Sequence, residues 1–172
     1  MEQSSGHKLA IHRAAILTIS DGVHAGTRQD LSGGALFDLL TSEGYQVTDR
    51  KVVPDDAAQI RNAIRDLAAR ASLVVTSGGT GFGPRDVTPE ATRAVLDRDA
   101  IGLVILMLSE GIKTNPLAAL SRAAAGVCGT SLVVNLPGSP KGAVENLTAL
   151  LAVLPHALTL LAGDTEHSPP GT

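Results

Sequence analysis

Short apolar runs alternate along the chain with segments whose apolar residues recur at helical spacing. Three of the runs have the length and β-branched content of strands, and they occupy 14–20, 45–53 and 72–77. The clearest helical segment is 57–70, in which Ile60, Ile64 and Leu67 fall on one face. Strands and helices therefore alternate through the first half of the chain.

The second half continues this alternation with less regular spacing. Helices are expected over 89–97 and over 102–113, and a further one begins at Pro140 and kinks or restarts at Pro155. In the first half, another helix is expected to end near Gly44. The segment 124–138 predicts a hairpin that feeds a strand, with Cys128 and Gly129 near its turn.

This order of elements predicts an α/β sandwich with a largely parallel sheet, because parallel strands need crossover helices. We expect a single domain over 14–163, a flexible leader at 1–13 and a disordered tail at 164–172. Ligands of such sheets bind beyond the carboxyl ends of the strands. Three polar, glycine-rich loops follow predicted strand ends, at 21–34, 77–88 and 136–141, so their chemistry is expected to meet in one place.

Composition narrows the classes of function. The 172 residues are 44% hydrophobic, as in a folded domain, but only 2% aromatic, which removes the stacking surface that single-stranded nucleic acid needs. A net charge of −3 also argues against a nucleic-acid partner. No apolar stretch reaches a membrane span, and the one cysteine, Cys128, excludes an internal disulfide, so a cytoplasmic location is expected.

The sequence SGGTG places Gly78, Gly79, Thr80 and Gly81 between a predicted strand and a predicted helix. Glycines at this position allow consecutive backbone N–H groups to converge on an anion, although a tight turn would require them equally. The loop is neither a Walker motif nor the spaced dinucleotide fingerprint. A phosphate cradle and a turn therefore both remain open.

Asp86 follows this loop and bears on the choice. A carboxylate about 5 Å from a phosphate charge repels it by about 3 kcal/mol at an effective dielectric near 20, so a cation, most simply Mg²⁺, would have to lie between them. The alternative is that Asp86 accepts a local hydrogen bond before a helix in which Thr88 is the N-cap and Pro89 the first residue.

Two further acids, Asp55 and Asp56, stand immediately before the clearest helix. One of them is expected to cap that helix, and this leaves the other free to face the ligand site as a metal ligand or general base. The five histidines show no zinc-like spacing with Cys128.

Three other segments carry weaker signals. Ser139 can cap a helix that begins at Pro140, which puts Lys141 in a first turn where a bound anion would favour it. Asp30, Ser32 and Gly33 stand at another helix entrance, where Ser32 could be a cap or part of an anion site. Ser121 and Arg122 offer a hydroxyl and a fork suited to phosphate, or a surface ion pair.

Taken in order, these segments resemble the molybdopterin adenylyltransferase family of molybdenum-cofactor biosynthesis, which includes gephyrin-like proteins. The matching stretches are LTISD (17–21), AGTRQDLSG (25–33), VPDD (53–56), TSGGTGFGPRDVTPEAT (76–92), PLAALSRAAAG (116–126) and LVVNLPGSPKG (132–142). Each piece is weak alone, but the combination is specific.

The resemblance implies a three-layer αβα sandwich that transfers AMP from Mg-ATP to the phosphate of molybdopterin, giving adenylylated molybdopterin and pyrophosphate. It also implies a homo-oligomer, trimeric or hexameric. Asp55 and Asp86 match the essential, metal-binding acids, and 78–81 matches the nucleotide-phosphate loop. The other positions expected to bind nucleotide or pterin are Ser20, Asp30, Ser32, Gly33, Ser121, Arg122, Pro137, Gly138, Ser139 and Lys141.

The chain departs from many relatives in having Ile101 before Gly102, where they have proline, and Leu108 near a common arginine. The helix over 102–113 could therefore differ in its subunit contact or in its pterin pocket. Two other functions stay open on the same scaffold: a nucleotide pyrophosphatase, and a non-catalytic module that binds or carries molybdopterin.

Overall fold

A computed structural model of the chain describes residues 12–163, so the predicted tail and nearly all of the predicted leader lie outside the described residues. Six strands form one sheet in the order β2-β1-β3-β6-β5-β4. Their bounds are Gln46–Val53 for β2, Arg13–Ile19 for β1, Leu73–Ser77 for β3, Ser131–Leu136 for β6, Ala125–Cys128 for β5 and Arg98–Asp99 for β4. The first four are parallel, and β5 runs antiparallel to both of its neighbours.

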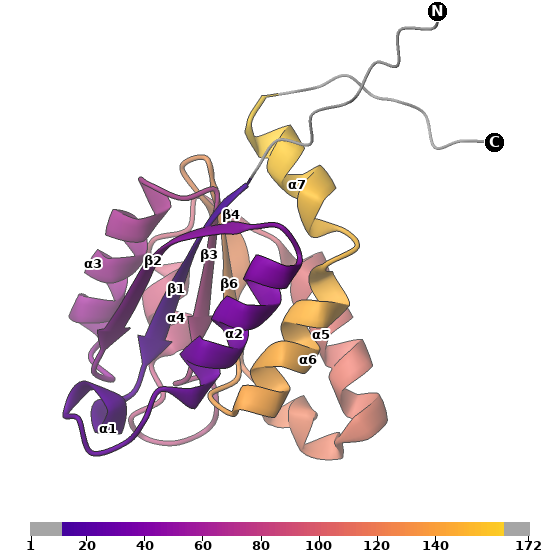
Figure 1. The fold of residues 1–172 in the computed structure, drawn as a ribbon. Helices are drawn as coiled ribbons and strands as arrows, with labels where there is room; N and C mark the ends of the chain where they lie inside the picture. Colours follow the sequence, from indigo (N-terminus) through magenta and orange to yellow (C-terminus); the bar gives the residue numbers. More distant parts are fainter. Residues whose placement is uncertain (1–11, 164–172) are drawn as a thin grey trace, which may run out of the picture.

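Helices cover both faces of the sheet, which confirms the three-layer arrangement (Figure 1). The α-helices span Asp21–His24 (α1), Leu31–Ser42 (α2), Ala57–Ala68 (α3), Thr88–Arg93 (α4), Ile101–Thr114 (α5), Pro140–Leu150 (α6) and Leu154–Leu161 (α7), and a 3-10 helix, η1, spans Pro116–Leu120. Helices α2, α5, α6 and α7 pack on one face, and α3 and α4 on the other.

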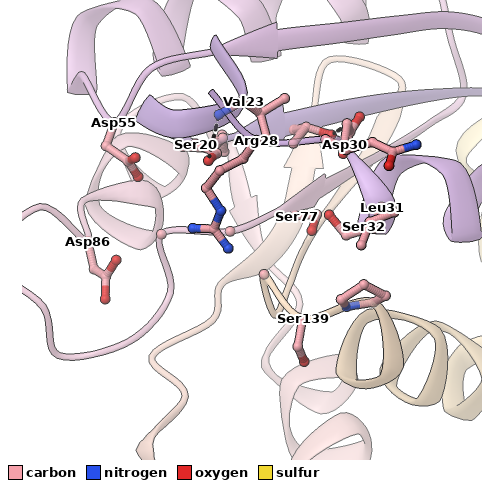
Figure 2. Close-up of a pocket in the computed structure, with 17 residues that line it drawn as sticks. Ser20, Val23, Arg28, Asp30, Leu31, Ser32, Asp55, Ser77, Asp86 and Ser139 are labelled. Atoms are coloured by element: carbon pink, nitrogen blue, oxygen red, sulfur yellow. Dashed lines mark hydrogen bonds between the residues drawn. The ribbon is translucent and has the colours of Figure 1, made fainter. Parts of the chain in front are cut away.

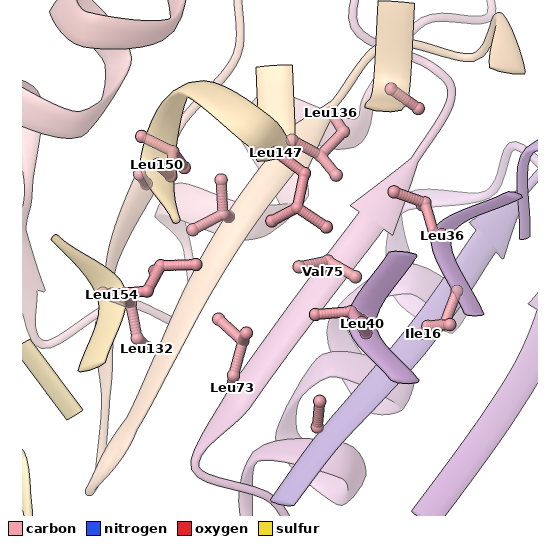
Figure 3. Packing of buried hydrophobic residues seen from close by; sticks show 14 of the residues in the cluster. Ile16, Leu36, Leu40, Leu73, Val75, Leu132, Leu136, Leu147, Leu150 and Leu154 are labelled. Carbon is pink, nitrogen blue, oxygen red and sulfur yellow. The ribbon is translucent and has the colours of Figure 1, made fainter. Parts of the chain in front are cut away.

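Alternation along the central strands divides the core between these two faces. In β3, Leu73 and Val75 join the cluster under α2 and α6, which Figure 3 shows, while Val74 joins the cluster under α3. Helices cover both faces of the sheet, so its central strands β1, β3 and β6 are almost wholly buried, whereas the edge strand β2 is largely exposed or half-buried. This explains why the sequence shows continuous apolar runs rather than alternating ones.

The predicted elements are confirmed with one clear exception. Helix α3 matches the segment expected over 57–70, the hairpin turns at Gly129 and Thr130 directly after Cys128, and α7 begins one residue before Pro155. The helix expected over 89–97 is wrong in its second half, because α4 ends at Arg93 and the chain then pairs with β5 as the short edge strand β4. Helices α1 and η1 were not foreseen.

Within residues 12–163, no single helix is both long and apolar enough to cross a membrane. Helices α6 and α7 reach that length and composition only when taken together, across a bend of 67°.

Candidate active site

A cleft of about 470 Å³ lies beyond the carboxyl ends of β1, β2, β3 and β6, as expected for a ligand site of a parallel sheet. Its walls come from the loops that follow these strands. Figure 2 shows Asp55 and Asp86 on one side of the cleft, and Asp30, Ser32 and Ser77 on the other. The predicted meeting of distant loops is therefore confirmed.

The glycine loop that follows β3 combines close packing with exposed amides. Gly78 and Gly79 have φ values of 105° and 65°, and a Cβ on Gly78 would lie 2.2 Å from the carbonyl oxygen of Ile19. The Gly78 amide donates to Leu136 O at 3.2 Å and is therefore not available to a ligand. The amides of residues 79–81 donate to no acceptor within residues 12–163, so they remain as candidate anion donors.

Arg122 braces this loop from behind. Its Nε donates to Gly81 O at 2.8 Å, its Nη2 donates to Asp86 O at 2.7 Å, and its Nη1 pairs with Glu90. The guanidinium is thus engaged with protein acceptors, and its observed role is to fix the loop. Ser121 accepts a hydrogen bond from the Ala123 amide at 3.3 Å.

The acids before α3 divide as the sequence predicted. Asp56 caps α3 by accepting from the Gln59 amide at 2.9 Å, while Asp55 lines the cleft and accepts from the Asp21 amide at 2.9 Å. Burial raises the pKa of Asp55 above its usual value; the Asp21 amide opposes this shift, and the negative charges of Asp21 and Asp86 add to it.

Asp86 makes the local hydrogen bond that was one of its two predicted roles, and it also lines the cleft. Its Oδ2 accepts from the Gly83 amide at 2.9 Å, which closes a local turn. Thr88 is not the N-cap of α4, because that position belongs to Val87, which makes no side-chain cap. The Thr88 hydroxyl is buried without a hydrogen-bond partner among the described residues, next to Gly79.

Asp55 and Asp86 are two carboxylates in one cleft, and two carboxylates suit a magnesium ion whose other ligands come from phosphate and water. No group of three or more His, Cys, Asp or Glu side chains in the described part of the chain is arranged to hold a metal alone. Magnesium is typically held by one or two carboxylates together with substrate phosphates, and it keeps several waters. Asp55 and Asp86 provide that donor set and no more.

The opposite wall is built around Asp30. Asp30, and not Ser32, caps α2 by accepting from the Gly33 amide at 2.9 Å, and it also accepts from the Thr18 hydroxyl at 3.0 Å. A Cβ on Gly33 would lie 2.2 Å from the Asp30 carboxylate, so this glycine serves the cap. Ser20 caps α1 and, like Ser32 and Asp30, lines the cleft.

A second cavity of about 240 Å³ adjoins the first, and Ser139 lines both. Four further expected site residues line this cavity and not the first: Thr80, Gly81, Ser121 and Pro137. Its far wall comes from α5, η1 and α6. Ser139 also caps α6 by accepting from the Gly142 amide at 3.2 Å, as the sequence predicted. Gly138 lines the first cleft.

Lys141 lines neither cavity. Its side chain is 84% exposed, and its Nζ lies 3.8 Å from Glu145, one turn further along α6. The structure therefore leaves Lys141 in solvent beside the site.

Arg28 lines the cleft but was not singled out in the sequence. Its side chain crosses the middle of the cleft in Figure 2, and it makes no ion pair or side-chain hydrogen bond within residues 12–163. Its stem packs against Gly22, where a Cβ would lie 2.6 Å from Arg28 Cδ. The available signal was an arginine in a glycine-containing loop between a strand and a helix.

The chain is similar to proteins of molybdenum-cofactor biosynthesis. A family model described as "Probable molybdopterin binding domain" matches residues 15–156. The chain is 34% identical to the molybdopterin adenylyltransferase of Escherichia coli K12, over 92% of this chain and 89% of that protein. It is 37% identical to gephyrin of Dictyostelium discoideum over 98% of this chain, but it spans only 25% of gephyrin.

Solved structures agree. The molybdopterin biosynthesis enzyme MoaB of Thermus thermophilus superposes with a TM-score of 0.84 at 48% identity, over 89% of this chain and 98% of that one. MogA superposes with a TM-score of 0.82 at 37% identity, over 87% of this chain and 99% of that one. The resemblance drawn from the motifs is confirmed, and the chain belongs to the molybdopterin-binding domain family of molybdenum-cofactor biosynthesis.

Proposed function

We propose that the chain transfers AMP from Mg-ATP to the phosphate of molybdopterin and releases pyrophosphate. The observation that carries this proposal is that Asp55, Asp86 and Gly79 line one cleft, and that the unpaired amides of residues 79–81 lead from it to an adjoining second cavity. Relatives named molybdopterin adenylyltransferase support the same reaction. We place it in the cytoplasm, where ATP is available and Cys128 stays reduced.

The first cleft would hold the nucleotide. Asp55 and Asp86 would hold Mg²⁺, which supplies positive charge to the phosphate that is transferred. Amides of the glycine loop and the Arg28 guanidinium donate to phosphate oxygens as charge grows on them. The reaction asks for little covalent chemistry from the protein, since its barrier is lowered mainly by positioning and by electrostatic stabilisation.

The second cavity would hold the acceptor. It meets the first at Ser139, so a phosphate held there stands next to the nucleotide-binding wall. Asn115 and Asn146 line this cavity, and carboxamides can both donate to and accept from the edge of a pterin ring. Ser121 adds a hydroxyl to the same wall.

Pyrophosphate release with Mg-ATP and molybdopterin tests the proposal. Asp86→Asn and Asp55→Ala should each slow release by about 100-fold or more, because electrostatic stabilisers of a transition state contribute on that scale. Asp38→Asn, an exposed acid on α2 outside both cavities, should leave the rate unchanged. Near-normal turnover in either cleft variant would remove that residue from the proposal.

The same assay separates the alternatives. Pyrophosphate released without molybdopterin would indicate a nucleotide pyrophosphatase. Tight molybdopterin binding with no release under Mg-ATP would indicate a carrier module. Transfer that depends on both substrates supports the adenylyltransferase.

We also infer a homo-oligomer, trimeric or hexameric, that uses the outer face of α5 and η1. Large apolar side chains are exposed there in the single chain: Ile101, Ile105, Ile112, Leu117 and Leu120. Clusters of exposed apolar side chains mark interaction surfaces. Sedimentation of the wild type should give a multiple of the chain mass, and Ile105→Asp should lower it; a wild-type monomer would contradict the inference.

A further inference from the structure

An ion pair outside the cleft wall joins the loop that carries Asp86 to Asp21, the first residue of α1. Arg85 Nε donates to Asp21 Oδ2 at 3.0 Å, and Arg85 Nη2 donates to Asp21 Oδ1 at 2.9 Å. This two-point contact fixes the orientation as well as the separation of the partners. Arg85 precedes Asp86 directly, so the contact sets the position of the Asp86 loop.

Asp21 is linked in turn to Asp55 by a reciprocal pair of hydrogen bonds. The Asp21 amide donates to Asp55 Oδ2 at 2.9 Å, and the Asp55 amide donates to Asp21 Oδ1 at 3.0 Å. One oxygen of the Asp55 carboxylate is thereby oriented by backbone. A continuous path of contacts runs from Asp86 through Arg85 and Asp21 to Asp55.

The hydrogen bonds from Arg122 have a different effect on the loop. Arg122 contacts the carbonyl oxygens of Gly81 and Asp86, which lie within a single loop, and therefore fixes the shape of that loop. The Arg85–Asp21 pair joins that loop to the turn at α1, and through it to Asp55. Arg122 thus fixes the conformation of the Asp86 loop, and Arg85 fixes the position of that loop relative to α1.

The geometry points to Asp21 and Arg85 as positioning residues that fix the carboxylates of Asp55 and Asp86 relative to each other on one side of the cleft. Neither residue lines the cleft, and the two side chains bond to each other, so the role assigned to them is one of position. The role rests on the proposed adenylyl transfer, in which both carboxylates act at one phosphate group. A misplacement of about 1 Å can cost about 100-fold in rate, so losing the pair should slow turnover more than it weakens binding.

Kinetics of Arg85→Gln, Asp21→Asn and the double variant test this role. Each single variant should lower kcat by about 10–100-fold with KM for ATP within about 3-fold of wild type. The double variant should be no slower than the slower single variant, because both remove one link. Arg85→Lys should recover part of the loss, since it keeps the charge but not the fork.

Arg70→Gln is the matched control. Arg70 also makes two side-chain hydrogen bonds to carboxylates on the surface, with Asp49 at 2.7 Å and Asp66 at 2.8 Å, away from the cleft. The kcat of Arg70→Gln should equal that of the wild type. Two results would overturn the positioning role. One is a double variant in which the kcat losses of the two single variants add in full, and the other is an Arg85→Gln variant with kcat within about 2-fold of wild type.

Hydrogen exchange without ligand separates this role from the proposed reaction. Amides of residues 20–24 and 81–87 should exchange at least about 5-fold faster in Arg85→Gln and unchanged in Arg70→Gln. If the wild type transfers no AMP, the proposed function fails, and faster exchange still supports the link between the loops. Unchanged exchange in Arg85→Gln overturns the link whatever the activity.

Discussion

Replacing Gly78 by alanine probes the junction between the glycine loop and the end of β1. Gly78 has a φ of 105°, a conformation that side-chain-bearing residues rarely adopt. The added Cβ would lie 2.2 Å from the carbonyl oxygen of Ile19, the last residue of β1. A backbone oxygen at a strand end cannot turn aside as a flexible side chain could, so the strand or the loop must shift.

The magnitude follows from two separable costs. A sparsely populated backbone conformation costs about 1–3 kcal/mol, and overpacking a tight site adds about 1–3 kcal/mol. We therefore expect a loss of about 3 kcal/mol or more in the free energy of unfolding, which for 172 residues is a fall of about 6–12 °C in Tm. The shifted loop should also weaken Mg-ATP binding.

Thermal unfolding with Gly129→Ala as control checks this reasoning. Gly129 also has a positive φ, of 62°, but a Cβ there meets nothing within 4 Å. This variant should therefore lose only about 1 kcal/mol, or about 2–4 °C. Equal losses in the two variants would refute the claim that the close approach to Ile19, beyond backbone strain, requires glycine at 78.

Three further predictions concern the acids, the core and a helix cap. Asp55→Asn should unfold at higher urea concentration than wild type near neutral pH. Burial raises the pKa of Asp55 in the folded protein above 3.8, so the wild type loses stability as pH rises through that raised pKa. The stability advantage of Asp55→Asn should therefore shrink towards about pH 4. An advantage that grew on acidification would contradict it. Asn135→Ala should lower the free energy of unfolding in urea by about 3–5 kcal/mol. Buried Asn135 donates to the hydroxyls of Thr76 and Thr92 at 2.9 Å and accepts from the Ala124 amide. A loss below about 1 kcal/mol would show that these hydrogen bonds add little stability. Ser139→Ala should cost about 1 kcal/mol by removing the α6 cap, whereas Ser139→Asp should retain that stability in urea unfolding.

Local features of the molecule could be read directly from the chain. The apolar runs at the centre of the sheet predicted β1, β3 and β6, since a strand buried on both faces must be apolar throughout. The pair Asp55 and Asp56 predicted one cap and one cleft acid, because a helix start needs a single such acceptor. Capping and turn formation act within a few residues, so their signals lie within one short window.

Contacts between distant segments could not be read in this way. Arg122 was expected at a phosphate or in a surface ion pair; it pairs with Glu90, and it also reaches back 41 residues to Gly81 and 36 residues to Asp86. The edge strand β4 was not expected, because its pairing with β5 has no signal in its own two residues. In each case the partner is chosen by packing of the whole chain.

The sequence alone determines the order of strands, helices and motifs, through hydrophobic pattern and local backbone chemistry. That order also indicates the family and the end of the sheet that bears the site. Tertiary structure decided the rest: the division of the expected residues between two cavities, the outward course of Lys141, and the bond between Arg85 and Asp21 across 64 residues. The reason is physical. A side chain's role depends on which acceptor lies within about 3 Å of it, and that distance is set only when the layers close on their core.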